Sequence, residues 1–423
     1  MVIKILNSKM TIQNIYNESN KNFLFNNSKK FLSLRGELLN NFDLSNRIKK
    51  NNESLKHLDP HVLEFSYKYK NLSNKISYLD SDKDATEVNV IDGKISTILN
   101  KKKDNIKINN IDSDNIVAEN FFLDFQNYFH NDYVVNLNSL MLNSGYEINI
   151  EKKQEENIFI SNDISEQDLT IFQKNIINCA EYSKVVIIEE YISDKKSNNN
   201  ILNFINIEKG ANVIHLIFQK NNSKAALQST SYTNCKDNSK YKQLILNISK
   251  SSIRNHHYAN LIGKDASAEL DGIFFASSDQ VIDNKTQVNH LFPNCISSQR
   301  YKGILTDEAK ASYLSKTFVD KIAQKTEAYQ LSKGILLSDN SHFHSKPELR
   351  IFADDVKCSH GSTIGPIDRD LLFYLRSRGL NKKQSTSLLI KSFFHDIISG
   401  INDKSFVEKF NYHSNVWLNY NNI

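Results

Sequence analysis

The spacing of hydrophobic residues changes character twice along the chain. Residues 14–133 show a mostly helical period in polar surroundings, as in KKFLSLRGELLNN. From Tyr146 onward, segments such as YEINI, VVIIEEYI and AELDGIFFAS alternate with a period of two, which is typical of β-strands. After Gly365 the helical period returns. We therefore expect an N-terminal helical domain over residues 1–144, a β core over 145–365 and a C-terminal helical domain over 366–423.

The β core is expected to be a stacked solenoid. Between Ala266 and Asp354 the strand-like segments recur roughly every 10–15 residues without a helix between them, which excludes a βαβ architecture. A sandwich or barrel with hairpin turns and a parallel β-helix remain. Asn-Gly and Asp-Gly hairpin turns are nearly absent from this region, so the pattern favours the parallel β-helix, in a mainly β fold flanked by helices.

Two helices are predicted after the core. PIDRDLLFYLRSRGL has Asp368 as its expected N-cap and Gly379 just past its end, and NKKQSTSLLIKSFFHDIISGI opens with the capping pair Asn381 and Gln384. This pair of helices either caps the open end of the solenoid or docks a partner. The docking interpretation rests on apolar residues spread over more than one helix face: Phe373, Leu375, Phe393, Phe394 and Ile398.

Composition narrows the function classes. The net charge of +5 is spread over scattered lysines in a chain of 423 residues, which does not favour nucleic-acid binding. No segment resembles a signal-peptide core or approaches the roughly 18 apolar residues of a membrane span. We therefore expect a soluble, cytoplasmic protein. The four cysteines form no CxxC pair, which argues against a disulfide framework and against a self-contained metal motif.

The stretch ADDVKCSHGSTIG contains the main candidates for chemistry. If it continues the strand of ELRIFADDV, alternation places Asp354, Cys358 and His360 on one strand face, with the last two roughly 7 Å apart. Thiolate and imidazole both bind iron or zinc, but two ligands fill only half of a tetrahedral shell. A buried cysteine beside a hydrogen-bonded histidine is the structural alternative.

Other candidate sites are weaker. His342 and His344 have the spacing of cupin metal ligands, but no convincing third histidine and glutamate accompany them. His256 and His257 are adjacent, so in a strand they face opposite sides. The chain has no GxxxxGK[ST], GxSxG or HExxH motif, so neither P-loop ATP hydrolysis nor a hydrolase signature is indicated.

Four segments together carry a family resemblance: NHLFPNCISSQRYKG, QKTEAYQLSKGILLSD, KPELRIFADDVKCSHGSTIG and LLFYLRSRGL. In this order and spacing they resemble the C-terminal part of the SufB/SufD family of iron–sulfur cluster assembly proteins. The KCSHG stretch and the lack of further cysteines favour the SufD side of that family. The resemblance implies a right-handed parallel β-helix between two helical domains.

The resemblance also implies a role. It is that of a non-enzymatic scaffold subunit of a SufBCD complex, which pairs with SufB and docks the SufC ATPase on its C-terminal helices. The nascent iron–sulfur cluster would be transient and shared with SufB, with His360 as a ligand, Cys358 as a less certain one, and no cofactor held permanently by this chain alone. The edge offered to SufB is predicted in ELRIFADDV, where Leu349, Ile351 and Ala353 alternate. Two alternatives remain: a β-helix carbohydrate-active enzyme with clustered acids on adjacent rungs, and a metal-free homodimeric adaptor.

Overall fold

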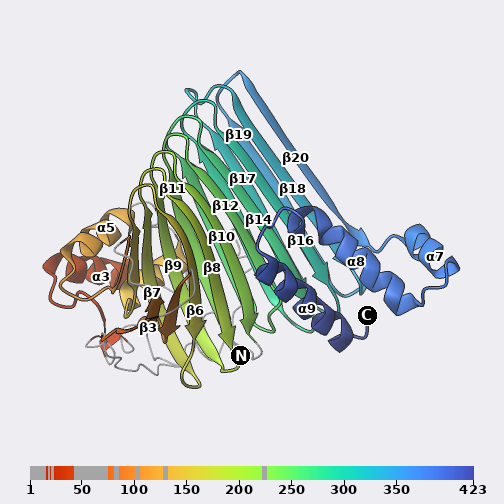
Figure 1. Cartoon of the computed structure of the whole chain (residues 1–423), viewed down its shortest axis with the longest axis horizontal. Coiled ribbons are helices and arrows are strands. Elements are labelled where there is room, and N and C mark those ends of the chain that lie inside the picture. The colour runs from red at the N-terminus through yellow and green to blue at the C-terminus, as the bar shows by residue number, and fades with distance from the viewer. Residues whose placement is uncertain are drawn as a thin grey trace.

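The computed structural model describes residues 16–17, 20, 23–41, 75–80, 85–100, 105–126, 132–221 and 226–423. Its centre is a parallel β-solenoid in which successive strands alternate between two sheets, so each rung contributes one strand to each sheet (Figure 1). This confirms the mainly β fold predicted from the sequence.

One sheet, here called sheet A, has nine strands in the order β19-β17-β15-β13-β11-β9-β7-β5-β4. Only the β4–β5 pair is antiparallel among the pairs that make up this sheet. The bounds are β4 (Ile106–Asn110), β5 (Tyr146–Ile150), β7 (Leu169–Cys179), β9 (Ser197–Ile207), β11 (Ala226–Cys235), β13 (Ser252–Leu261), β15 (Val281–His290), β17 (Lys310–Val319) and β19 (His342–Ile351).

The second sheet, sheet B, has eleven strands in the order β1-β3-β2-β6-β8-β10-β12-β14-β16-β18-β20. From β6 to β20 every neighbouring pair is parallel. The bounds are β1 (Ser77–Asp80), β2 (Thr86–Ile91), β3 (Lys94–Asn100), β6 (Glu155–Asp163), β8 (Lys184–Ser193), β10 (Asn212–Asn221), β12 (Lys240–Asn247), β14 (Ser267–Ala276), β16 (Ile296–Leu305), β18 (Thr326–Leu336) and β20 (Val356–Pro366).

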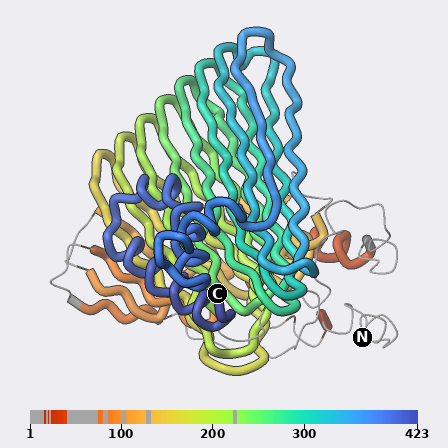
Figure 2. The backbone as a smooth tube through the Cα atoms, turned by 90° about the vertical axis from the view of Figure 1, so that its right-hand side faces the viewer, coloured from red at the N-terminus to blue at the C-terminus, as the bar shows by residue number. Residues whose placement is uncertain are grey.

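The corners of the rungs are built alike. A residue with positive φ recurs at the same corner of successive rungs, at Tyr182 (59°), Gly210 (68°) and Asn238 (56°). The backbone N–H of each donates to the carbonyl of the corner one rung further on, as from Tyr182 to Lys209 at 3.0 Å. Because the corners are hydrogen-bonded as well as the strands, the rungs stack in register, as Figure 2 shows.

The N-terminal helices α3 (Lys29–Asn41), α5 (Ile116–Gln126) and α6 (Tyr133–Met141) cover the outer face of sheet A. The Phe125 ring of α5 lies edge-on to Phe204 of β9, with 4.2 Å between ring centroids. Helix α6 begins at the N-cap Asp132, whose carboxylate accepts hydrogen bonds from the backbone N–H of Val134 and Val135. The helices bury apolar side chains that would otherwise be exposed on this face.

The prediction of a helical region over residues 14–133 is wrong between Ser77 and Asn110. Strands β1 to β4 lie there, and β2 and β3 form an antiparallel hairpin. Its turn is Asp92–Gly93, with φ of 52° and 83°. An Asp-Gly turn between alternating apolar residues is a strong local hairpin signal, and it outweighs the weak helical period of the flanking sequence.

The C-terminal chain forms α7 (Arg369–Ser377), α8 (Lys382–Ile398) and α9 (Lys404–Tyr420). The predicted N-cap Asp368 and the capping box of Asn381 with Gln384 are both confirmed. Helices α8 and α9 pack on the outer face of sheet B. There the rings of Phe394 and Trp417 both contact the Phe275 ring, each with 5.1 Å between ring centroids. They therefore lie alongside the solenoid, and the end-cap interpretation is wrong.

Candidate functional site

The last rung of the solenoid is open on its outer side. Strands β19 and β20 are the final strands of sheets A and B, and no strand in the described part of the chain pairs with their outer edges. Side chains that point into the interior are covered in every earlier rung by the next one. In this rung they are partly exposed. No residue of β20 is fully buried, whereas nearly every residue of β14 is.

Cys358 and His360 lie on β20 and point toward the interior side of this open rung. Cys358 pairs in register with the buried Ala328, and His360 pairs with the buried Gln330. Cys358 is half-buried against Ala353 and Val319, and burial raises the pKa of its thiol, whereas His360 is exposed. The two side chains therefore share a face, as predicted, at the end of the solenoid.

The strand that brings them together differs from the predicted one. β19 ends at Ile351, the chain turns a corner through Asp354 and Asp355, and β20 begins at Val356. Asp354 is thus not on the strand face of Cys358. Alternation survives within β20 alone, because residues 358 and 360 are two apart on one strand.

The other three cysteines lie inside the solenoid. Cys179, Cys235 and Cys295 are free and fully buried. Burial raises the pKa of the Cys179 and Cys235 thiols to about 12 and that of Cys295 to about 11. Thiols that stay protonated are poor nucleophiles and poor metal ligands, so Cys358 is the accessible thiol of the chain.

The predicted pairing edge is divided between a strand and a corner. Leu349 is half-buried on β19, and Ile351 ends that strand with 36% of its surface exposed. Ala353 is wrongly placed by the prediction, because it is buried in the corner beside Val319 and Ala323. The backbone N–H of Phe352 donates to the carbonyl of Val319 in β17 at 3.0 Å. Because N–H groups alternate in direction along a strand, the N–H of Ile351 faces the open edge of β19.

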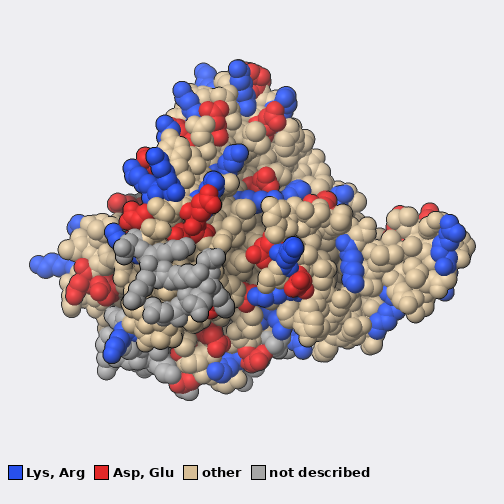
Figure 3. Space-filling view, in the orientation of Figure 1, with Lys and Arg blue, Asp and Glu red and all other residues tan. Residues whose placement is uncertain are grey.

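The predicted docking residues of the C-terminal helices fall into two groups. Phe373 is 74% exposed on α7, which has no buried residue and projects from the body of the molecule (Figures 1 and 3), and Leu375 is half-buried on the same helix. Phe394 and Ile398 are buried against sheet B, so they cannot contact a partner and were wrongly assigned to the docking surface. Phe393 is half-buried, with the Lys302 ammonium 5.0 Å from its ring centroid.

The other candidate histidines, all within the described residues, do not form a cluster of metal ligands. His256 faces outward and lies 3.0 Å from the carboxylate of Asp283, and His257 faces inward, which confirms that they point to opposite sides. His342 and His344 are exposed on the outer face of β19. Within the described ranges, no group of three or more His, Cys, Asp or Glu side chains could hold a metal ion by itself.

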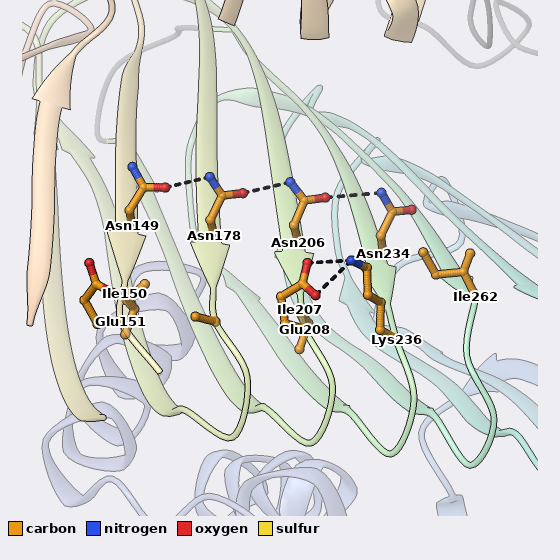
Figure 4. Close-up of a pocket in the computed structure, with 11 residues that line it drawn as sticks. Asn149, Ile150, Glu151, Asn178, Asn206, Ile207, Glu208, Asn234, Lys236 and Ile262 are labelled. Carbon is orange, nitrogen blue, oxygen red and sulfur yellow. Dashed lines mark hydrogen bonds and ion pairs between the residues drawn. The ribbon is translucent and has the colours of Figure 1, made fainter. Parts of the chain in front are cut away.

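A second feature is a ladder of asparagines on the outer face of sheet A (Figure 4). Each side-chain amide donates to the asparagine of the preceding rung, as from Asn178 to Asn149 at 2.7 Å and from Asn206 to Asn178 at 2.8 Å. The further members are Asn234, Asn260 and Asn289. The ladder borders a groove of about 430 Å³ that the Glu208–Lys236 ion pair also lines.

Sequence reasoning missed this ladder. The signal was an asparagine followed by a residue that proves to be buried, as in Asn178-Cys179 and Asn206-Ile207. This pair recurs after 26 to 29 residues. An internal repeat of that length marks a solenoid rung, and identical amide side chains on stacked strands pair with each other.

The structure thus defines a β-solenoid protein with an open terminal rung. This rung presents a thiol, an imidazole and two strand edges that no described strand pairs with. The chain matches the family described as SUF system FeS cluster assembly, SufBD core domain, over residues 159–393. This chain belongs to that family and is SufD-like within it.

Three curated relatives illustrate the match. The chain is 32% identical over 203 residues to an iron–sulfur cluster assembly SufBD family protein of Synechocystis, a match that covers 48% of this chain and 45% of the relative. It is 31% identical over 152 residues to iron–sulfur cluster assembly protein SufD of Escherichia coli, covering 36% of each. It is 27% identical over 223 residues to the chloroplastic protein ABCI7 of Arabidopsis thaliana, covering 52% of this chain and 47% of that protein. The aligned part therefore spans less than half of each of these relatives.

Among the described residues, no helix is both long enough and apolar enough to cross a membrane.

Proposed function

We propose that this chain is a non-catalytic scaffold subunit that holds a nascent iron–sulfur cluster at its open terminal rung. The observation that carries the proposal is the placement of Cys358 and His360 on one face of β20, at the end of the solenoid, where no further rung of the described chain covers them. The cluster is cargo, and the ligands that this chain lacks come from the partner that covers the rung.

The partner in this proposal is SufB, another member of the same family. Because members of one family share a fold, a second solenoid would offer strands with which the free edges of β19 and β20 can pair. Strand pairing across the edges would bring a partner's side chains over the open rung. Cys358 and His360 would then lie at the interface between the two subunits.

The SufC ATPase is the proposed partner of α7. This helix exposes Leu371, Phe373 and Tyr374, and none of its residues is buried in the described structure. An exposed apolar surface on a projecting helix is a typical protein-interaction site. Since this chain has no P-loop, ATP hydrolysis in the complex would come from that partner.

The proposal is tested by co-expressing the chain with SufB and SufC and measuring iron and sulfide in the complex purified without oxygen. We expect His360→Ala to lower both contents while the melting temperature and the subunit composition stay unchanged. Cys358→Ser should have a smaller effect. His342→Ala is the matched control, because His342 lies in the same rung but faces outward on β19.

Two results would contradict the cluster assignment. One is normal iron and sulfide in the His360→Ala complex. The other is a lowered melting temperature of that variant with normal cluster content, since this would make His360 a structural residue.

A further inference from the structure

The three N-terminal helices α3, α5 and α6, here called the helical layer, meet sheet A around two buried cations that the proposed function does not use. The side chains of Arg35 in α3 and Lys174 in β7 are both fully buried. The Arg35 guanidinium donates to the backbone carbonyls of Leu24 at 2.8 Å and Leu140 at 3.2 Å, and to the Asn26 side chain at 2.9 Å. Each of its three nitrogen atoms therefore has an acceptor.

The ammonium of Lys174 has fewer partners than it has N–H groups. It carries three donors, but within the described ranges its one hydrogen bond goes to the Ser139 hydroxyl of α6, at 2.8 Å. That hydroxyl donates in turn to Gln126 of α5, and the Phe122 ring of α5 lies 5.0 Å from the ammonium. A charged ammonium in this position is unfavourable, because a buried charge needs a counter-charge or a full set of hydrogen bonds.

In the described structure, the groups packed around Lys174 do not compensate its charge. From α3 it faces Arg35, which Tyr16 also influences electrostatically, and from α5 and α6 it faces the uncharged side chains just named. Within sheet A its register neighbour on β9 is Leu202, and toward β5 Gly145 lies against its backbone. Burial, followed by the charge of Arg35, lowers the pKa of Lys174 to about 7.

The helical layer is attached to sheet A in a way that lets it open by itself. Its helices contact the sheet through side chains, such as Phe122 and Phe125 against Phe204, whereas the strands beneath are joined by continuous backbone ladders. Segments without such ladders open at a lower free energy than the core of a sheet. In the open form Lys174 would be hydrated, and its pKa would return to the ordinary value of 10.5.

We propose that the helical layer is a pH-dependent cover of sheet A, which stays closed while Lys174 is neutral and opens more readily when Lys174 binds a proton. The open form would expose apolar side chains of β7 and β9 that the layer now buries, among them Ile176, Leu202 and Phe204. This device lies at the opposite end of the solenoid from the open rung and goes beyond the proposed function.

The direction of the pH effect follows from the two protonation equilibria. Below pH 10.5 the open form holds a proton on Lys174, whereas the closed form holds one only below about pH 7. Because the open form binds more protons between these values, the equilibrium constant for opening rises as the pH falls through this window. Between pH 8.5 and pH 6.5 it should rise about twentyfold.

Hydrogen–deuterium exchange of the isolated full-length chain tests this at pH 8.5 and pH 6.5, after correction for the intrinsic pH dependence of amide exchange. We expect the amides of α5 and α6 to be less protected than those of β10 and β12 at both pH values, because the layer opens without the solenoid. Their protection should be about twentyfold lower at pH 6.5 than at pH 8.5. Lys174→Met has no proton to bind and should lose this pH dependence, whereas Lys240→Met, at an exposed position, should keep it.

Ser139→Asp provides a second test, because a carboxylate beside the ammonium favours the charged form of Lys174 in the closed layer. This variant should also lose less protection at pH 6.5 than the wild type does. The proposal is wrong if the helices of the wild type are as well protected as β10 and β12, or if both variants of the Lys174–Ser139 pair keep the wild-type pH dependence. Either result would leave the cluster assignment untouched, because that assignment depends on iron and sulfide content.

Discussion

The ammonium of Lys174 in β7 donates a hydrogen bond of 2.8 Å to the Ser139 hydroxyl of α6, beneath the N-terminal helices. Its side chain is fully buried, the ammonium lies 5.0 Å from the ring centroid of Phe122, and no carboxylate of the described residues forms an ion pair with it. Burial, with a smaller contribution from Arg35, lowers the pKa of Lys174 to about 7.

Lys174→Met should therefore change how stability depends on pH. Between about pH 7 and pH 10.5 the unfolded chain binds a proton at Lys174 that the folded chain does not, so this lysine makes stability rise with pH in that window. The variant lacks this pH dependence. The difference in unfolding free energy between Lys174→Met and the wild type should therefore favour the variant by about 3 kcal/mol more at pH 6.5 than at pH 9.5. Urea unfolding at both pH values measures this difference. Lys240→Met is the control, because Lys240 is exposed, and its unfolding free energy relative to the wild type should not change with pH. If Lys174→Met gains the same stability at both pH values, the lowered pKa of Lys174 is contradicted.

The stability contributed by the asparagine ladder should depend on which amide donates and which accepts in each hydrogen bond. Asn206 donates to Asn178 and accepts from Asn234, whereas Asn149 at the start of the ladder accepts from Asn178. Asn206→Asp loses its donor and brings a carboxylate against an acceptor oxygen, which should lower the unfolding free energy by about 1–3 kcal/mol. Asn149→Asp keeps the acceptor and should cost less. Denaturant unfolding compares the two, and equal losses would show that ladder direction is unimportant.

Ile351→Pro should block partner pairing without disturbing the native sheet. The N–H at this position faces the open side of β19, and Pro347 already occupies an equivalent position four residues earlier on the strand. We expect the variant to keep its melting temperature but to elute from size exclusion separately from SufB. Ile351→Val retains the N–H and should co-elute. An unchanged complex with the proline variant would place the pairing edge elsewhere.

Phe373→Ser should weaken SufC binding and leave stability unchanged, because this ring is mostly exposed on α7. Phe394→Ala should instead lower the unfolding free energy by about 3–5 kcal/mol, because the fully buried Phe394 ring packs against Phe275 and Phe410. Calorimetry with SufC and thermal unfolding measure the two effects. Normal SufC affinity of Phe373→Ser would remove α7 from the dock.

Local sequence patterns were enough to predict the class of fold and the main candidate residues for chemistry. Alternating apolar residues without intervening helices specify stacked strands, since alternation sends every second side chain into a core. Cys358 and His360 share a face for the same local reason, because two residues of separation on a strand are enough. The caps at Asp368 and Asn381 are likewise set by bonds within four residues, so they could be predicted.

Which surfaces are covered depends on packing between elements that are distant in sequence. Phe373 and Phe394 look alike in sequence, but Phe373 is exposed on α7, whereas Phe394 lies on the face of α8 that packs against sheet B. Inside the solenoid, Glu189, His215 and Tyr241 likewise hydrogen-bond to one another from three different strands. Burial and side-chain pairing across rungs depend on register between segments about 28 residues apart, which no local pattern specifies.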